Sequence, residues 1–157
     1  MKKIIVLLLA LTMVFVLCAC GGEKEAIENK SAVEAEKQYD VVVEDCAVAW
    51  EGNGYIAIKP KVHNCTDMDA AFLLVNCELI DKDGRTMRVT GCDTGGVAAG
   101  ANEWVGGIIQ IKNDEISELA ELRFSGGNFD ISKDGSCYRQ TVSFAETSFT
   151  KEHVFGE

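Results

Sequence analysis

Hydrophobic and polar side chains alternate with a period of two along much of the chain after residue 40. In residues 55–64, YIAIKPKVHN, one face of an extended chain carries Ile56, Ile58 and Val62. The opposite face carries Tyr55, Ala57, Lys59, Lys61 and His63. Successive side chains of a strand point to opposite sides of a sheet, so this alternation predicts a strand with one buried face.

The same pattern recurs in further segments that are separated by glycine, asparagine and aspartate. In residues 71–81, AFLLVNCELID, one face carries Leu73, Val75, Cys77 and Leu79. The other candidate strands are VVVEDCAVAW (41–50), RTMRV (85–89), WVGGIIQI (104–111), LAELRFSG (119–126) and CYRQTVSFA (137–145). Short strands at such regular spacing predict an all-β fold, an antiparallel β-sandwich of about seven strands.

Two segments depart from simple alternation. Pro60 is the only proline of the chain. Because proline has no N–H to donate to a ladder, its strand is expected to be an edge strand or to bulge there. In residues 113–122, NDEISELAEL, the larger apolar residues recur at helical spacing. This spacing predicts one short helix or turn before the strand that ends at Phe124.

The first twenty residues have the pattern of a secretory leader. Lys2 and Lys3 precede residues 4–17, which are apolar except for Thr12. A membrane-spanning helix needs about 20 apolar residues, so this run fits a leader better than a span. Residues 17–20, LCAC, resemble the lipobox of bacterial lipoproteins, which implies that Cys20 is lipidated and that residues 1–19 are removed. The alternative is cleavage elsewhere, which would release a soluble secreted protein.

The sequence then divides into a tether and a domain. Residues 20–39 are rich in Glu, Lys and Ala, with too few large apolar residues to bury a helix face. We therefore predict a lipoprotein leader at 1–19, a lipidated Cys20 with a flexible tether at 20–39, and the sandwich domain at 40–157. The expected location is the outer face of a bacterial cell membrane, in a Gram-positive organism.

The net charge of the chain excludes some classes of binding partner. The chain carries 15 Lys and Arg against 25 Asp and Glu, a net charge of −10. A strongly acidic chain is not expected to bind nucleic acid, whose phosphates need basic groups. No basic amphipathic stretch is present to press the domain onto anionic lipid. We therefore expect membrane contact through the lipid on Cys20 alone.

Three segments carry a resemblance to a known domain family. They are Val62 and Asn64, CELID at 77–81 followed by Asp83 and Gly84, and VAAGANEW at 97–104. Together they resemble the FxLYD type of immunoglobulin-like domain found in bacterial lipoproteins, with Cys77, Ile80 and Ala99 in place of the family's Phe, Tyr and Pro. The resemblance implies an immunoglobulin-like, extracytoplasmic β-sandwich, and it supplies no catalytic residues.

Two short motifs have candidate chemistry. Residues 92–96, CDTGG, contain the Asp-Thr-Gly triplet of aspartic peptidases, which pair two such aspartates around a water. A second triplet is missing, so Asp93 would need a homodimer, and a glycine loop between two strands is preferred. Residues 81–84, DKDG, are similar to the start of a calcium loop, but two arginines follow. A hairpin turn is preferred, with Asp67 and Asp69 as the residues that could complete a cation site.

The cysteines, histidines and aromatic residues leave several possibilities open. Cysteines 46, 65, 77, 92 and 137 follow Cys20, and an odd number leaves at least one without an intramolecular partner. Cys77 is expected to be buried, whereas Cys65 and Cys92, near predicted turns, are expected to be the exposed thiols. An exposed cysteine could act with His63 or His153 as a nucleophile pair. The aromatic residues Trp50, Trp104, Tyr55 and Tyr138 could form a platform for a glycan or peptide, or fill the core.

No complete catalytic constellation or metal motif emerges, so we predict no cofactor and a non-enzymatic function. The expected function is a lipid-anchored binding or adaptor domain of the bacterial cell envelope, with an envelope protein or wall glycan as partner. The alternative is a hydrolase on the outer face, either a dimeric acid peptidase that uses Asp93 or a thiol enzyme.

Overall fold

The structure, a computed structural model, describes residues 38–156. The predicted leader, Cys20 and most of the tether lie outside the described residues, so lipidation of Cys20 stays a prediction. Among the described residues, no helix has both the length and the apolar character to cross a membrane.

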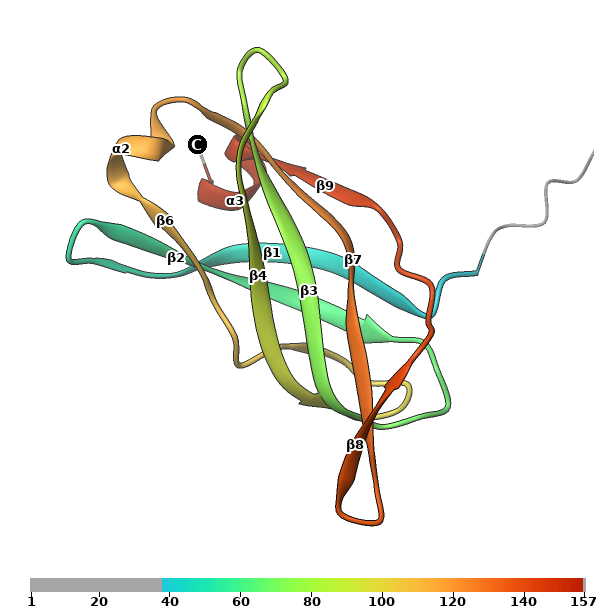
Figure 1. The fold of residues 1–157 in the computed structure, drawn as a ribbon. Helices are drawn as coiled ribbons and strands as arrows, with labels where there is room; N and C mark the ends of the chain where they lie inside the picture. Colours follow the sequence, from blue (N-terminus) through green and yellow to red (C-terminus); the bar gives the residue numbers. More distant parts are fainter. Residues whose placement is uncertain (1–37, 157) are drawn as a thin grey trace, which may run out of the picture. The chain divides into compact units, whose positions relative to one another are not determined.

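Two antiparallel sheets pack face to face, so the predicted all-β sandwich is confirmed (Figure 1). The strands are β1 (Val41–Gly52), β2 (Tyr55–Asn64), β3 (Ala70–Asp81), β4 (Thr86–Val97), β5 (Asn102–Trp104), β6 (Ile109–Lys112), β7 (Leu119–Lys133), β8 (Ser136–Gln140) and β9 (Thr147–Thr150). The helices are α2 (Asn113–Ile116) and α3 (Lys151–Phe155). In the first sheet β2 lies between β1 on one side and β5 and β6 on the other. In the second sheet the order is β4-β3-β7, and β8 and β9 pair with opposite halves of β7.

The described residues form nine strands, where about seven were predicted. The predicted strand over residues 104–111 is broken, because β5 ends at Trp104 and β6 begins at Ile109. The predicted strand over residues 137–145 ends at Gln140, and β9 follows after a connection. The short helix predicted within residues 113–122 is confirmed as α2.

The core lies between the two sheets and uses the faces that alternation predicts. From β2 it takes Ile58 and Val62, and from β3 it takes Leu73, Val75, Cys77 and Leu79, each no more than 1% exposed. Phe124 and Phe129 of β7 are the largest fully buried side chains. Burying each large aliphatic or aromatic side chain contributes about 1.5–3 kcal/mol, so this shared layer is the main source of stability.

The position of Pro60 differs from the prediction of an edge strand. β2 is the central strand of its sheet. On one side of β2, however, the paired strand changes from β6 to β5 at Pro60, so the ladder needs no backbone N–H at this residue. Tyr55 to Ile58 pair with β6, and Lys61 to His63 pair with β5. The carbonyl of Pro60 accepts a hydrogen bond from the backbone N–H of Val105 in the gap between these strands. A proline is therefore accommodated at the interruption.

A buried amide joins two turns at one end of the sandwich. The side chain of Asn64, which is fully buried, donates to the carbonyl oxygens of Met68 (2.9 Å), Val97 (3.1 Å) and Ala98 (3.1 Å). Its oxygen accepts from the backbone N–H and the hydroxyl of Thr66. Asn64 thus connects the end of β2 to the β2–β3 turn and to the β4–β5 turn.

The connection between β5 and β6 packs tightly against β4. A Cβ atom at Gly107 would lie 1.7 Å from the carbonyl oxygen of Asp93 and 2.8 Å from Sγ of Cys92. Only glycine fits this approach, because real Cβ atoms do not come so close to other heavy atoms. Gly107 therefore allows the β5–β6 connection of the first sheet to pack directly against β4 of the second sheet.

We expect Asn64→Ala to lower the free energy of unfolding by about 3 kcal/mol, because it leaves several buried carbonyl groups without their donor. Urea denaturation measures the change. Asn113→Ala is the matched control, since that residue is exposed at the start of α2; it should change stability by about 0.5 kcal/mol or less. Equal effects of the two variants would show that the buried network does not stabilise the fold.

Gly107→Ala should destabilise the domain by about 3 kcal/mol or more, since the new methyl group would overlap the β4 backbone. Gly106→Ala is the control, because a Cβ atom there meets no atom within 4 Å. Thermal unfolding of both variants tests the packing. A Gly107→Ala protein as stable as the Gly106→Ala protein would contradict it.

Candidate functional site

The outward face of the first sheet is the candidate site. It comprises the side chains that point away from the core on β1, β2, β5 and β6. Trp50 pairs with Ala57, Trp104 pairs with Lys61, and Tyr55 pairs with Lys112. Because Ile58 and Val62 of β2 point into the core, Ala57, Lys59 and Lys61 and their cross-strand partners point outward. We call this surface the aromatic-lysine face and define it by Trp50, Tyr55, Trp104, Lys59, Lys61 and Lys112.

Three aromatic residues on this face are accessible to a ligand. Trp50 is 40% exposed, Tyr55 is 36% exposed and Trp104 is 42% exposed. Trp50 lies beside Gly52, where a Cβ atom would be 3.7 Å from the indole ring. Large apolar side chains usually lie inside, so three of them on one outward face are a potential binding surface.

A β-bulge places Trp50 there. Val48 pairs with Ile58 on the core side, and strict alternation would also turn Trp50 inward. The register shifts between Val48 and Trp50, so the side chain of Trp50 emerges beside Ala57 on the outer side. An extra residue in one strand reverses the direction of all side chains that follow it.

A second bulge brings two neighbouring carboxylates of β1 together with both histidines of the chain. The register shifts between Val43 and Asp45. Glu44 lies 3.0 Å from Nδ1 of His63 and also accepts a hydrogen bond from Asn102. Asp45 lies 2.7 Å from Nε2 of His153 in α3. The hydrogen bond from Asn102 is the largest of the interactions that lower the pKa of Glu44, so this carboxylate stays ionised.

The positive charges of the three lysines on the face are only partly balanced by nearby carboxylates. Lys61 lies 3.7 Å from Glu44, which His63 also contacts. Lys112 lies near Glu115, whose carboxylate already receives two hydrogen bonds from Arg88, at 3.1 and 3.0 Å. For Lys59, no ion pair with another residue of the 38–156 segment is formed. Lys59, at the centre of the face, is therefore a lysine without an ion pair, although the chain as a whole is acidic.

The sequence predicted that Asp93 lies in a glycine loop between two strands. This prediction is wrong, because Asp93 lies within β4 and pairs with Leu74. Its Oδ1 accepts a hydrogen bond from the backbone N–H of Gly95 at 2.9 Å. The hydroxyl of the buried Thr94 donates to the Leu73 carbonyl, which ties the triplet into the sheet. Within the described part of the chain, the Asp93 side chain contacts no second carboxylate. Within one chain, residues 38–156 therefore do not assemble a two-aspartate site.

The DKDG segment forms the hairpin turn that was predicted. Asp81 Oδ1 accepts from the backbone N–H groups of Asp83 (2.9 Å) and Arg85 (2.8 Å), and Gly84 has a φ of 78°. Asp69 lies just before β3, whereas Asp81 ends it, so roughly 35 Å of strand separate them. No cluster of three metal-ligating side chains occurs among residues 38–156. The carboxylates considered for calcium are therefore not brought together.

The cysteines are distributed differently from the prediction. Cys77 is buried, as predicted, but Cys92 is also fully buried, because it occupies a core position of β4 instead of a turn. Cys137 on β8 is the exposed thiol, and Cys65 is half-buried. Burial raises the pKa of Cys77 and of Cys92 to about 12. Burial also raises the pKa of Cys65, and Glu44 and Asp40 add to this shift, which disfavours the thiolate that a nucleophile needs.

Cys65 does not form a nucleophile pair with His63. Its Sγ lies 4.0 Å from the carbonyl oxygen of His63, whereas the imidazole ring contacts Glu44. The carboxylate of Asp45 engages His153 in the same way. Both imidazole rings thus contact carboxylates of β1.

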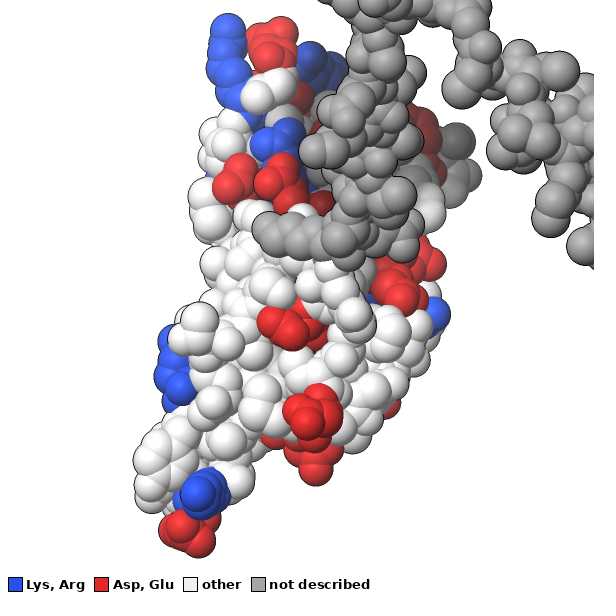
Figure 2. Space-filling view, turned by 90° about the vertical axis from the view of Figure 1, so that its right-hand side faces the viewer, with Lys and Arg blue, Asp and Glu red and all other residues white. Residues whose placement is uncertain are grey.

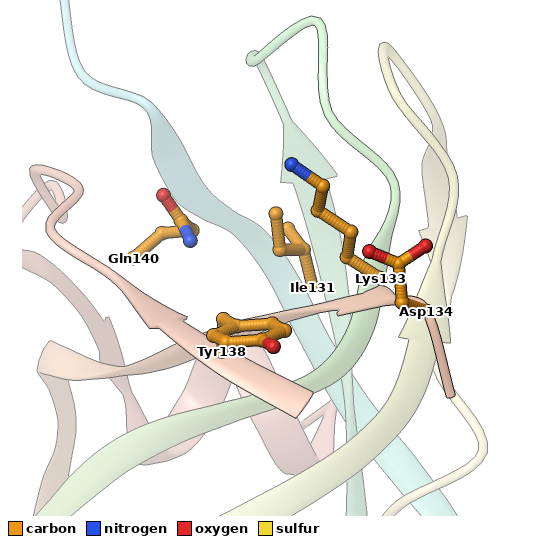
Figure 3. A pocket seen from close by; sticks show the side chains of 5 residues that line it. All are labelled: Ile131, Lys133, Asp134, Tyr138 and Gln140. Atoms are coloured by element: carbon orange, nitrogen blue, oxygen red, sulfur yellow. The ribbon is translucent and has the colours of Figure 1, made fainter. Parts of the chain in front are cut away.

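Tyr138, the fourth aromatic residue of the predicted platform, lies elsewhere. It is 49% exposed on β8, in the second sheet, and is not part of the aromatic-lysine face. With Ile131, Lys133, Asp134 and Gln140 it lines an open pocket of about 390 Å³ on the β7–β8 hairpin (Figure 3). Figure 3 shows Lys133 and Asp134 at its margin, next to the hairpin turn.

Charged side chains are dispersed on a second side of the domain. Figure 2 shows the side on which β9 lies, and the visible acidic and basic groups are interspersed with uncharged residues. The visible part of this side has no concentrated charge that would attract a ligand. The aromatic-lysine face remains the stronger candidate.

Comparison with known proteins gives no further direction. No protein-family model matches the chain, and no curated protein matches it.

Sequence reasoning found part of this face. The alternation in β2 correctly placed Tyr55, Lys59, Lys61 and His63 on its polar side. It missed Lys112, because only the pairing of β6 with β2 brings this residue beside Tyr55. No local pattern indicates this pairing, since the two strands are far apart in the sequence.

The reactivity of the thiols should follow their burial. In a chain whose Cys18 and Cys20 are replaced by serine, we expect Cys137 to react first with a thiol reagent at pH 8 and Cys65 more slowly. The buried Cys46, Cys77 and Cys92 should react only on unfolding. Mass spectrometry of the labelled peptides measures the order, and Cys137→Ser should remove the fast phase. Rapid labelling of Cys77 in the folded protein would contradict this burial.

Proposed function

We propose that this protein is a lipid-anchored, non-enzymatic binding domain on the outer face of a bacterial cell membrane. In this proposal Cys20 carries the lipid, and residues 20–39 tether the sandwich to a Gram-positive membrane. The aromatic-lysine face binds another component of the cell envelope. The single observation that carries the binding function is the presence of three half-exposed aromatic side chains and three lysines on one outward sheet face.

The immunoglobulin-like character is part of the proposal. Two of the three segments that carry the resemblance to FxLYD-type domains meet at Asn64, whose amide donates to the carbonyls of Val97 and Ala98. A Val-x-Asn segment and a VAAG segment are thus joined by one buried side chain. This contact supports the proposal that the domain is immunoglobulin-like and similar to the FxLYD-type domains of bacterial lipoproteins.

The placement of the reactive residues supports binding over hydrolysis. Asp93 is held within β4 by a backbone hydrogen bond, and the buried thiols have raised pKa values. A nucleophile and its base would have to lie within hydrogen-bond reach of each other. The histidines instead contact Glu44 and Asp45.

Crosslinking on intact cells that make the full chain tests the proposal. We expect a specific envelope component to be recovered with the native protein and lost with a Trp50→Ala, Trp104→Ala double variant. Cys20→Ala should release the protein from the membrane fraction and also abolish this recovery. Mass spectrometry and sugar analysis identify what is recovered.

Tyr138→Ala is the matched control, because it removes an exposed aromatic side chain outside the face. It should leave crosslinking unchanged. Recovery that does not depend on Trp50 and Trp104 would overturn the binding face. A Cys20→Ala protein that stays in the membrane fraction would overturn the lipid anchor.

A further inference from the structure

We infer that the aromatic-lysine face binds a polysaccharide that carries carboxylate groups, such as a polymer of uronic acids. This inference rests on the proposed function and specifies its ligand. It is drawn from the arrangement of backbone, aromatic rings and ammonium groups on the face.

The backbone of the face favours a ligand that needs no strand pairing. β2, at its centre, is paired with β1 on one side and with β5 and β6 on the other. A peptide that binds as an added strand requires a free sheet edge, which the middle of this sheet does not offer. A ligand on the face therefore contacts side chains, and a sugar ring can stack its apolar C–H side on an aromatic ring.

The aromatic rings are spaced for an extended ligand. Trp50 pairs with Ala57 and Trp104 pairs with Lys61, on opposite sides of β2. From strand geometry, four residues along β2 and two strand spacings separate their Cα atoms by roughly 16 Å. Tyr55 extends the row of aromatic residues beyond Trp50 toward the β1–β2 turn. A polymer can reach both tryptophans at once, whereas a single sugar can reach only one.

Lys59 explains why the polymer should be anionic. It lies two residues along β2 from Ala57 and two from Lys61, and thus between the two tryptophans. Its ammonium group forms no ion pair with any residue from 38 to 156, whereas Glu44 and Asp45 at one end of the face are each engaged by a histidine. A carboxylate of the ligand would supply the missing partner of Lys59 through a charge-assisted hydrogen bond.

The test uses the full chain in detergent micelles and three uronic-acid polymers: polygalacturonate, alginate and hyaluronate. Isothermal titration calorimetry measures the dissociation constants. We expect at least one polymer to bind, and Trp104→Ala to weaken that binding by about ten-fold or more. Lys59→Gln should also weaken it and reduce its dependence on salt, because ion pairs at the surface are screened.

Matched controls separate this site from general effects. Tyr138→Ala and Lys133→Gln remove an aromatic residue and a lysine on the β7–β8 hairpin and should leave binding unchanged. Neutral dextran should bind weakly or not at all, and poly-L-glutamate tests whether charge alone suffices. The melting temperatures of the variants confirm that each remains folded.

Each contrary outcome has a defined meaning. If none of the three polymers shows binding that depends on Trp104, the inference is wrong. Equal affinity for dextran, or for poly-L-glutamate, would also overturn a carboxylate-bearing glycan as the ligand. If crosslinking on cells still depends on Trp50 and Trp104, the proposed function survives and only the ligand class fails. If that dependence is absent too, both fail.

Discussion

The arrangement of the sandwich around its outward face depends on the buried side chain of Asn64. A carboxamide has two N–H donors and an acceptor oxygen, and here all of them are used on two different turns. The backbone N–H of Asn64 also donates to the carbonyl of Ala101, directly before β5. Aspartate would lack the donors and leucine would lack every polar atom, so either would leave buried backbone groups unpaired. Asn64 thereby fixes where β5 begins and sets Trp104 beside Lys61.

The composition of the face depends on bulges in β1 as much as on β5. One bulge exposes both Glu44 and Asp45, and the other turns Trp50 away from the core. These two irregularities give the face one end where Glu44 and Asp45 each contact a histidine, and a centre where Lys59 forms no ion pair with residues 38–156. Bulges commonly re-aim side chains near binding sites, because they change direction without breaking the sheet. The aromatic-lysine face is thus a product of local irregularity on a regular frame.

Several side chains with potentially nucleophilic groups, three cysteines and one threonine, are buried and contribute to the packing of the domain. Cys46, Cys77 and Cys92 occupy inward positions on β1, β3 and β4, where a thiol packs as a small apolar group. Burial disfavours their charged forms, and so raises the pKa of each thiol. The hydroxyl of Thr94 is likewise bound to the backbone of Leu73. Groups that would serve as nucleophiles in an open cleft are here part of the packing.

The sequence by itself determined the fold class, the inward faces of β2 and β3, the DKDG turn and the short helix before β7. These features depend on alternation and turn chemistry, which act over a few residues. Tertiary structure decided that Pro60 lies in a central strand, that Cys92 is buried and that Trp50 points outward. Each depends on a partner strand or on a shift in register, and pairing between distant segments leaves no local pattern. For the same reason the aromatic-lysine face, whose first strand ends at Gly52 and whose last strand begins at Ile109, became visible only when β2 was found between β1, β5 and β6.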